Sequence, residues 1–114
     1  MVNSYPEFYK HVQANMAKYG KESPDIMAGF MRLHKAGSTD GALSAKVKEL
    51  IALAIGITVR CDGCIAFHVH DALEAGASHD EIVEAIGVAI LMGGGPAVVY
   101  GSQALEALEQ FENQ

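Results

Sequence analysis

Apolar residues along the chain recur mostly at the three- and four-residue spacing of helices, and glycine and proline cut this pattern into segments. The alternation typical of a half-buried strand is not sustained in any segment, and no Asn-Gly or Asp-Gly turn joins two such runs. The pattern predicts six helices, at about residues 6–19, 24–36, 45–58, 61–75, 79–92 and 96–111. Short loops between them favour an all-α bundle, formed as a single domain over residues 1–114.

Helix-capping residues mark several of the expected starts. Ser23 precedes Pro24, which suits the first turn of a helix, and Gly20 is expected to end the helix before it. Ser44 is expected to cap the third helix, and Ser78 with a glutamate three residues later forms a capping box for the fifth. The triple glycine at 93–95 predicts a tight connection between the last two helices, in which another backbone can approach closely.

The third segment carries apolar residues around much of its circumference. Its main stripe consists of Val47, Leu50, Ile51, Ala54, Ile55 and Thr58. Leu53 and Ile57 lie off that stripe, so we expect this helix at the centre of the bundle. Glu49 interrupts the apolar surroundings, and a carboxylate buried there is costly unless it has a partner.

Composition and charge exclude several classes of partner. Half of the residues are hydrophobic and only 19% are charged, which suits a globular domain whose surplus apolar surface is covered in a homo-oligomer. The net charge is −6 and the basic residues are scattered, which argues against nucleic acid and an anionic membrane. Neither a signal peptide nor a bilayer-length apolar run is visible, so we expect a cytoplasmic protein.

The two cysteines of the chain lie in the stretch VRCDGCIAFHVHDA, residues 59–72. In a reducing compartment such a pair is more typical of catalysis or metal binding than of a structural cross-link. On a helix, with Cys61 at zero, Cys64 lies at about 300°, His68 at about 340° and His70 at about 180°. His68 therefore shares a face with both cysteines, and His70 points to the other side.

The position of the cysteine pair at a helix start favours the thiolate form of a cysteine. Free backbone N–H groups and the helix dipole stabilise a thiolate there, and this argument favours Cys61 as the thiol of lower pKa. His68, one turn beyond Cys64, could take or return a proton. A turn after Arg60 could fold the third helix back, so that Glu49 orients His68. These residues predict a dithiol redox centre.

Glu49, Cys61, Cys64 and His68 spell Glu-x11-Cys-x2-Cys-x3-His, which resembles the signature of the alkylhydroperoxidase D-like family in the carboxymuconolactone decarboxylase superfamily. The resemblance extends from about residue 44 to 108. It implies an all-α homotrimer or homohexamer that reduces hydroperoxides without a cofactor or metal. It also implies re-reduction by a dithiol donor such as a lipoyl-bearing or thioredoxin-like protein.

The same resemblance assigns roles to the four residues. Cys64 corresponds to the peroxidatic thiol that becomes a sulfenic acid, and Cys61 to the resolving thiol that closes the disulfide. His68 and Glu49 correspond to the proton relay. The chain departs from the best-known peroxidase of this type at Gly63, where that enzyme has a histidine, so its substrate and reductant need not be the same.

Other interpretations of the cysteine pair stay open. The two thiols could be inert and structural, or Cys61, Cys64 and His68 could be three ligands of zinc, with a fourth from His34 or another histidine only through folding or assembly. Covalent haem in its usual form is excluded, because Ile65 stands where the motif needs histidine. A non-enzymatic redox sensor and a decarboxylase-type lyase are the alternative functions, although the superfamily's lactone decarboxylases generally lack the cysteine pair.

Overall fold

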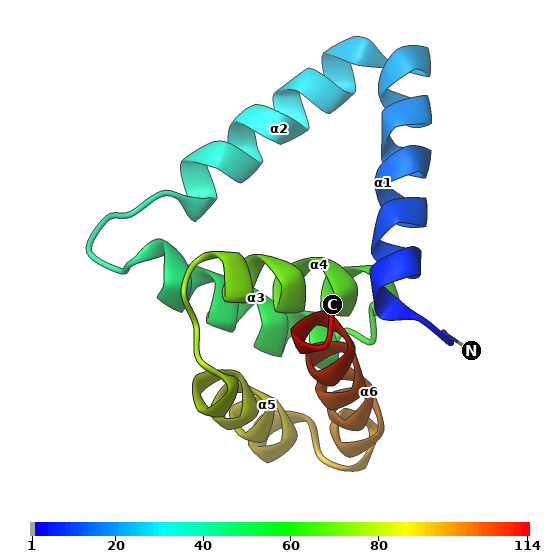
Figure 1. Cartoon of the computed structure of the whole chain (residues 1–114). Helices are drawn as coiled ribbons and strands as arrows, with labels where there is room; N and C mark the ends of the chain where they lie inside the picture. Colours follow the sequence, from blue (N-terminus) through cyan, green and yellow to red (C-terminus); the bar gives the residue numbers. More distant parts are fainter. Residues whose placement is uncertain (1) are drawn as a thin grey trace.

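In the computed structural model, residues 2–114 form six α-helices and no strand (Figure 1). The helices are α1 (Tyr5–Glu22), α2 (Pro24–Ser38), α3 (Ala45–Thr58), α4 (Asp62–Glu74), α5 (His79–Gly93) and α6 (Gly95–Glu112). The prediction of an all-α fold is confirmed. Met1 lies outside the described residues, and the single domain over residues 1–114 stays a prediction.

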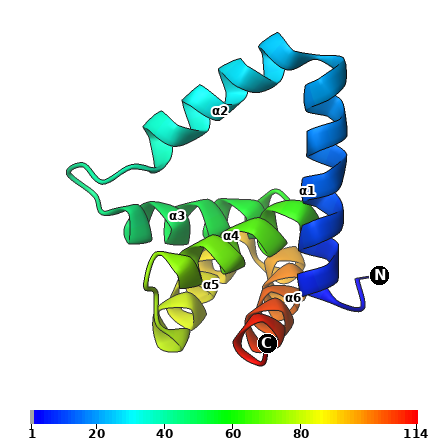
Figure 2. The same cartoon turned by 45° about the horizontal axis from the view of Figure 1, so that its top comes forward.

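Helices α3 to α6 form the body that contains the core. Both views show α3 and α4 beside one another, with α5 and α6 packed against the same side of this pair (Figures 1 and 2). The large side chains that are fully buried in this body are Leu53, Ile57, Ile65, Val69, Ile82 and Leu108. Because these residues come from all four helices, their burial fixes how α3 lies against α4.

Helices α1 and α2 form an arm that stands away from the body. The N-terminal end of α1 is attached to the body by Tyr5, which is almost fully buried and whose backbone N–H donates to Gln110 Oε1 at 2.7 Å. Burial raises the pKa of Tyr5 to about 12, with the negative charge of Asp62 adding to the effect. Helix α2 spans the space between α1 and the start of α3 and has no buried residue (Figure 2). Among residues 2–114, no helix is both long and apolar enough to pass through a lipid bilayer.

Helix α3 is central, as expected, but a different face of it is buried. It contacts α2, α4, α5 and α6. Leu53 and Ile57 are fully buried, whereas Ile51 and Ile55 of the predicted stripe are 44% and 57% exposed. Since α4, α5 and α6 pack on the side that carries Leu53 and Ile57, the stripe is divided: Leu50 and Ala54 are half-buried against the core, and Ile51, Ile55 and Thr58 are left on the outside of this chain.

Helix boundaries differ from the prediction at two glycine positions. Gly20 does not end α1, which continues to Glu22, and the N–H of Ser23 donates to the Tyr19 carbonyl. Within the triple glycine only Gly94 breaks the helical path, with a φ of 68° that favours glycine. A Cβ on Gly93 would lie 2.8 Å from that of Ala97, so a side chain, and not another backbone as expected, approaches this connection closely.

The expected serine caps behave differently at the three helices. Ser44 and Ser78 accept hydrogen bonds from backbone N–H groups of α3 and α5, and the capping box of α5 is complete. Ser23 precedes α2 but its side chain makes no capping hydrogen bond. Its backbone N–H is already used to close the end of α1, so one residue serves both helices.

Candidate active site

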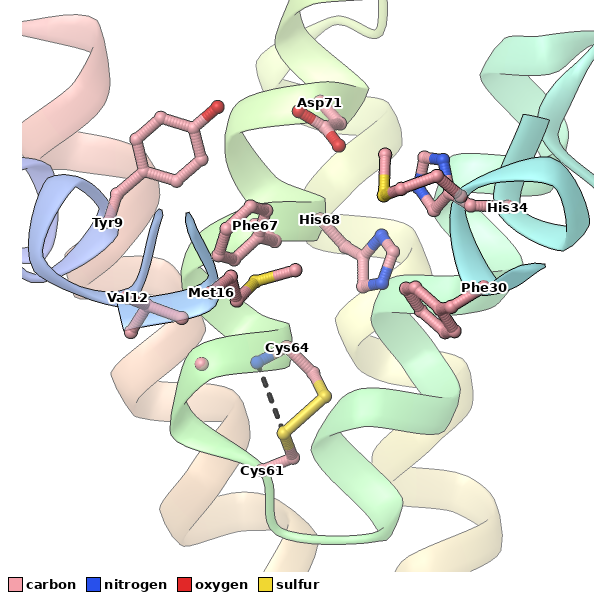
Figure 3. A pocket seen from close by; sticks show the side chains of 12 residues that line it. Tyr9, Val12, Met16, Phe30, His34, Cys61, Cys64, Phe67, His68 and Asp71 are labelled. Atoms are coloured by element: carbon pink, nitrogen blue, oxygen red, sulfur yellow. Dashed lines mark hydrogen bonds between the residues drawn. A yellow bond between two sulfur atoms is a disulfide. The ribbon is translucent and has the colours of Figure 1, made fainter. Parts of the chain in front are cut away.

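A disulfide joins Cys61 and Cys64 at the start of α4 (Figure 3). Arg60, just before it, has a left-handed backbone with a φ of 61°, uncommon for a residue with a Cβ, and reverses the chain after α3. Cys61 is the N-cap residue of α4, and the N–H of Cys64 donates to Cys61 Sγ at 3.1 Å. The cysteine pair therefore lies at the positive end of the helix dipole, as the sequence predicted.

Close packing of α3 against α4 holds this corner of the fold. The N–H of Cys61 donates to the Gly56 carbonyl at 3.0 Å, and a Cβ on Gly56 would lie 3.0 Å from that of Cys64. Any larger residue at position 56 would push against Cys64, since few real Cβ contacts are so short. Gly56 thus positions the second cysteine.

His68 and Glu49 face each other across the same pair of helices. His68 Nδ1 lies 2.8 Å from Glu49 Oε2. The Glu49 side chain is 9% exposed and that of His68 is 22% exposed, so the pair is largely removed from water. The reversal after Arg60 brings these residues together although they are 19 positions apart. Glu49, Cys61, Cys64 and His68 therefore occupy one corner of the fold.

A cavity of about 330 Å³ opens onto the disulfide between α1, α2 and α4. In Figure 3 the disulfide lies toward the bottom, Asp71 toward the top, and His68 between them. Most of the lining is apolar, from Val12, Met16, Phe30, Met31 and Phe67. The arm therefore supplies one wall of the cavity and α4 supplies the reactive groups.

Three further polar residues, which the Glu-Cys-Cys-His motif does not include, line this cavity: Tyr9, His34 and Asp71. Asp71 lies three residues after His68, so helical spacing alone could have placed it on the same face. Burial raises the pKa of Tyr9, and the negative charges of Asp71 and Glu74 add to this effect. His34, considered from the sequence only as a possible fourth zinc ligand, is exposed and lines the cavity from α2.

His70 lies apart from the cysteines, as its helical position predicted. Its ring stacks on Tyr9 with the ring centres 4.2 Å apart, and its Nδ1 lies 2.9 Å from Asp71 Oδ1. His70 therefore supports the far end of the cavity.

The residues that could share a metal ion differ from the predicted zinc ligands. In the disulfide form neither Cys61 nor Cys64 can offer a thiolate. One ligand atom each from Glu49, His68 and Asp71 lies within 4.8 Å of the other two. His68 is the ligand common to both sets.

Comparison with known proteins gives one consistent family. The model of the carboxymuconolactone decarboxylase family matches residues 24–107. An uncharacterized protein of Cupriavidus necator is 42% identical over 86 residues, which is 75% of this chain and 76% of that protein. An uncharacterized protein of Haemophilus influenzae is 37% identical over 107 residues, covering 94% and 95% of the two chains.

Two solved structures share the fold. The apo form of lpg0406 from Legionella pneumophila, a carboxymuconolactone decarboxylase family protein, has a TM-score of 0.90 at 42% identity and covers 94% of this chain and 96% of its own. A protein of the same family from Thermotoga maritima, described as "possibly involved in antioxidative response", has a TM-score of 0.83 at 28% identity. That match covers 92% of this chain and 90% of the Thermotoga chain.

Proposed function

Because this chain belongs to the carboxymuconolactone decarboxylase family, we propose that it is a thiol-dependent hydroperoxide reductase within it. One observation carries the proposal: the Cys61–Cys64 disulfide opens into a cavity one helical turn from His68, which pairs with the buried Glu49. A dithiol that closes reversibly, with a proton carrier beside it, has the parts needed to reduce an O–O bond. The antioxidative role suggested for the Thermotoga relative supports the same direction.

The proposed cycle starts from the two reduced thiols. The Cys64 thiolate attacks one peroxide oxygen, so that an S–O bond forms and the O–O bond breaks. The leaving alkoxide takes a proton from His68 and departs as an alcohol. The Cys61 thiolate then attacks the sulfenic acid on Cys64, the disulfide forms, and the displaced hydroxide leaves as water after protonation.

Surrounding groups have distinct tasks in this cycle. Nδ1–H of His68 donates to Glu49, which fixes the ring and leaves Nε2 to exchange protons in the cavity. The backbone N–H of Cys64 and the α4 dipole favour the thiolate form of Cys61, which is the form that attacks. The apolar wall favours an organic hydroperoxide with an apolar substituent over hydrogen peroxide.

A second dithiol must return two electrons to the disulfide in each cycle. We propose that a lipoyl-bearing or thioredoxin-like protein in the cytoplasm supplies them by thiol–disulfide exchange. We also propose that the working form is a homotrimer or homohexamer, since many large apolar side chains of this chain are exposed. Nucleic acid and membranes are not among the proposed partners.

The test is steady-state consumption of cumene hydroperoxide with dihydrolipoamide as reductant. Wild type should turn over many times, and both Cys64→Ser and Cys61→Ser should lose turnover. Turnover that survives in a variant carrying both Cys61→Ser and Cys64→Ser would overturn the proposal. A thiol pair that oxidises once without efficient re-reduction would favour a redox sensor, and a lyase should keep its activity after both cysteines are replaced.

A further inference from the structure

We propose that Glu49, His68 and Asp71 bind a divalent transition-metal ion, Zn²⁺ in preference to Mg²⁺ or Ca²⁺, and that the ion and the relay proton exclude each other. One ligand atom from each residue lies within 4.8 Å of the other two. Glu49 comes from α3, while His68 and Asp71 are three residues apart on α4 and so face the same side. Two packed helices therefore bring the three groups together.

The local charge favours a cation at this position. Glu49 and Asp71 carry two negative charges when ionised, and the ion-pair partners found for them are the histidines His68 and His70. Within residues 2–114, no Lys or Arg nitrogen lies within 4.0 Å of either carboxylate. The nearby Lys48 instead donates to the Thr39 carbonyl at 2.7 Å.

Burial makes this charge imbalance important. The side chain of Glu49 is nine-tenths buried, so water offers it little stabilisation, and His68 and Asp71 are each less than a third exposed. A divalent ion between these ligands would offset both carboxylate charges. His70 Nδ1 lies 2.9 Å from Asp71 Oδ1, and this contact orients Asp71 from outside the cluster.

The site has room to complete a coordination shell. His68 lines the cavity of about 330 Å³ that contains the disulfide and a second cavity of about 250 Å³ that also contains Glu49. His34 from α2 lines both cavities, and Figure 3 shows it on the α2 side of the cavity that His68 and Asp71 also line. It can supply a second imidazole, and water can fill the remaining position.

Donor type selects the metal. A set of two carboxylates with one or two imidazoles is typical of Zn²⁺ and its first-row neighbours, whereas Mg²⁺ and Ca²⁺ prefer oxygen ligands throughout. Two ligands of one tetrahedral zinc ion lie about 3.3–3.6 Å apart when each is about 2.0–2.2 Å from it. His68 Nδ1 and Glu49 Oε2 are 2.8 Å apart, so the ion would replace the proton between them and move the two side chains slightly apart.

Metal binding has a chemical consequence for the relay. The ion takes the lone pair of His68 Nδ1 and an oxygen of Glu49, and the proton shared between these two atoms is released to solvent. His68 then has no Glu49 partner to re-orient it, and the relay cannot return a proton to the leaving alkoxide. This inhibitory step rests on the proposed function, but the binding itself does not.

Calorimetric titration of Zn²⁺ into the disulfide form tests the site directly, because neither cysteine can offer a thiolate there. Asp71→Asn should weaken binding at least about tenfold, since loss of even a supporting partner of a ligand costs that much. Glu74→Gln removes the same charge from α4 at an exposed position and should change the affinity less than about twofold. The absorption spectrum of bound Co²⁺ should show an imidazole and carboxylate environment.

Three results would overturn the site: no binding by the wild-type disulfide form, equal affinity in Asp71→Asn, or equal losses in Asp71→Asn and Glu74→Gln. Glu49→Gln provides a second ligand variant if Asp71→Asn fails to fold. Inhibition of hydroperoxide turnover by Zn²⁺ should be reversed by a chelator and weakened in Asp71→Asn. Equal inhibition in that variant would assign the inhibition to the reduced thiols and overturn the inhibitory role.

The two proposals fail in different ways. Zinc binding that depends on Asp71, in a protein with no hydroperoxide turnover, would uphold the site and defeat the proposed function. Turnover without zinc binding to the disulfide form would do the reverse.

Discussion

At the scale of single residues, the two cysteines occupy unequal positions. Cys61 is outside the helical turn and accepts a backbone hydrogen bond at the positive end of α4. Cys64 is inside the first turn, packed against Gly56 and one turn before His68. The helix dipole argues that Cys61 ionises more readily, whereas access to the proton carrier favours Cys64 as the thiol that meets peroxide.

Trapping of the sulfenic acid separates these two roles. In Cys61→Ser, one equivalent of cumene hydroperoxide should leave a sulfenic acid on Cys64, because the thiol that would resolve it is absent. Cys64→Ser should gain no oxygen at the same dose. Intact mass after reaction with dimedone measures both outcomes. A stable adduct on Cys61 in Cys64→Ser, with none in Cys61→Ser, would reverse the assignment.

Glu49→Gln tests the relay without removing the hydrogen-bonding side chain. The amide keeps the size of the side chain but loses the charge that orients His68. We expect the kcat/KM for hydroperoxide to fall about ten- to a hundredfold. Circular dichroism should show unchanged helix content.

Glu84→Gln is the matched control, because Glu84 is exposed on α5 away from the cavity. Its kinetics should equal those of wild type. A Glu49→Gln variant with the kcat/KM of wild type would show that Glu49 does not act in the relay.

At the scale of whole elements, helix α5 is held by charged groups at its first turn. Glu81 accepts from the Ser78 N–H and pairs with Lys46 of α3 at 2.9 Å. The pKa of Glu81 is lowered by the backbone hydrogen bond from Ser78 first and by Lys46 second. His79, the next residue after the cap, pairs with Glu112 at the end of α6 at 3.0 Å. These contacts tie α5 to the helices on both sides.

The His79–Glu112 pair predicts a pH-dependent part of stability. The hydrogen bond that His79 donates to the Glu112 carboxylate raises the pKa of His79 above its usual 6.5, so the charged form is favoured in the folded chain. The stabilisation is full below about pH 6.5 and is lost as pH rises through the raised pKa. Glu112→Gln should therefore lower the urea midpoint at about pH 5.5 and leave it unchanged at about pH 8.5.

Glu106→Gln removes an exposed carboxylate from the same helix and serves as control. Its midpoint should not vary relative to wild type between the two pH values. An equal loss in Glu112→Gln at both pH values would mean that the ion pair with His79 does not contribute.

The starts of helices were predictable from the sequence where residues at the helix end itself determine them. Pro24, Ser44 and the capping box at Ser78 start helices because they satisfy or remove free N–H groups at those points. The buried face of α3 was not predictable, since Leu53 and Ile55 are equally apolar and only the position of the neighbouring helices distinguishes them. Gly20 was predicted to end α1, but it lies within the helix. A Cβ at this position would lie 3.3 Å from Met27, so the close packing of α1 on α2 accounts for the glycine.

Some residues of the candidate site were likewise predictable from the sequence, and others were not. Glu49, Cys61, Cys64 and His68 have a fixed spacing along one helical hairpin, so one motif identifies all four. Asp71 lies outside the motif, but its position three residues after His68 places it on the same face of the helix. His34 gives no local signal, because it reaches the cavity only through the arm and its relation to α4 is set by packing between distant segments.

At the scale of the whole molecule, apolar surface is left uncovered on two sides. Helix α2 exposes Ile26 and Leu33 in the arm, and Leu33 is 68% exposed. On the body, the outer face of α3 and the end of α5 expose Ile55 and Met92, which line a shared groove. Contiguous apolar surface of this kind is unusual on a monomer, and a second copy of the chain that covers it would account for both sides.

Wild type should sediment as a homotrimer or homohexamer, and Leu33→Gln or Met92→Gln should shift the mass toward smaller species, because each places an amide where apolar contact is expected. Lys35→Gln, on the same helix as Leu33 but already polar, should keep the wild-type mass. Sedimentation equilibrium at several protein concentrations measures the masses. Since the arm forms one wall of the cavity, variants that dissociate should also lose hydroperoxide turnover. A wild type that stays monomeric at every concentration would show that the arm is held by this chain alone.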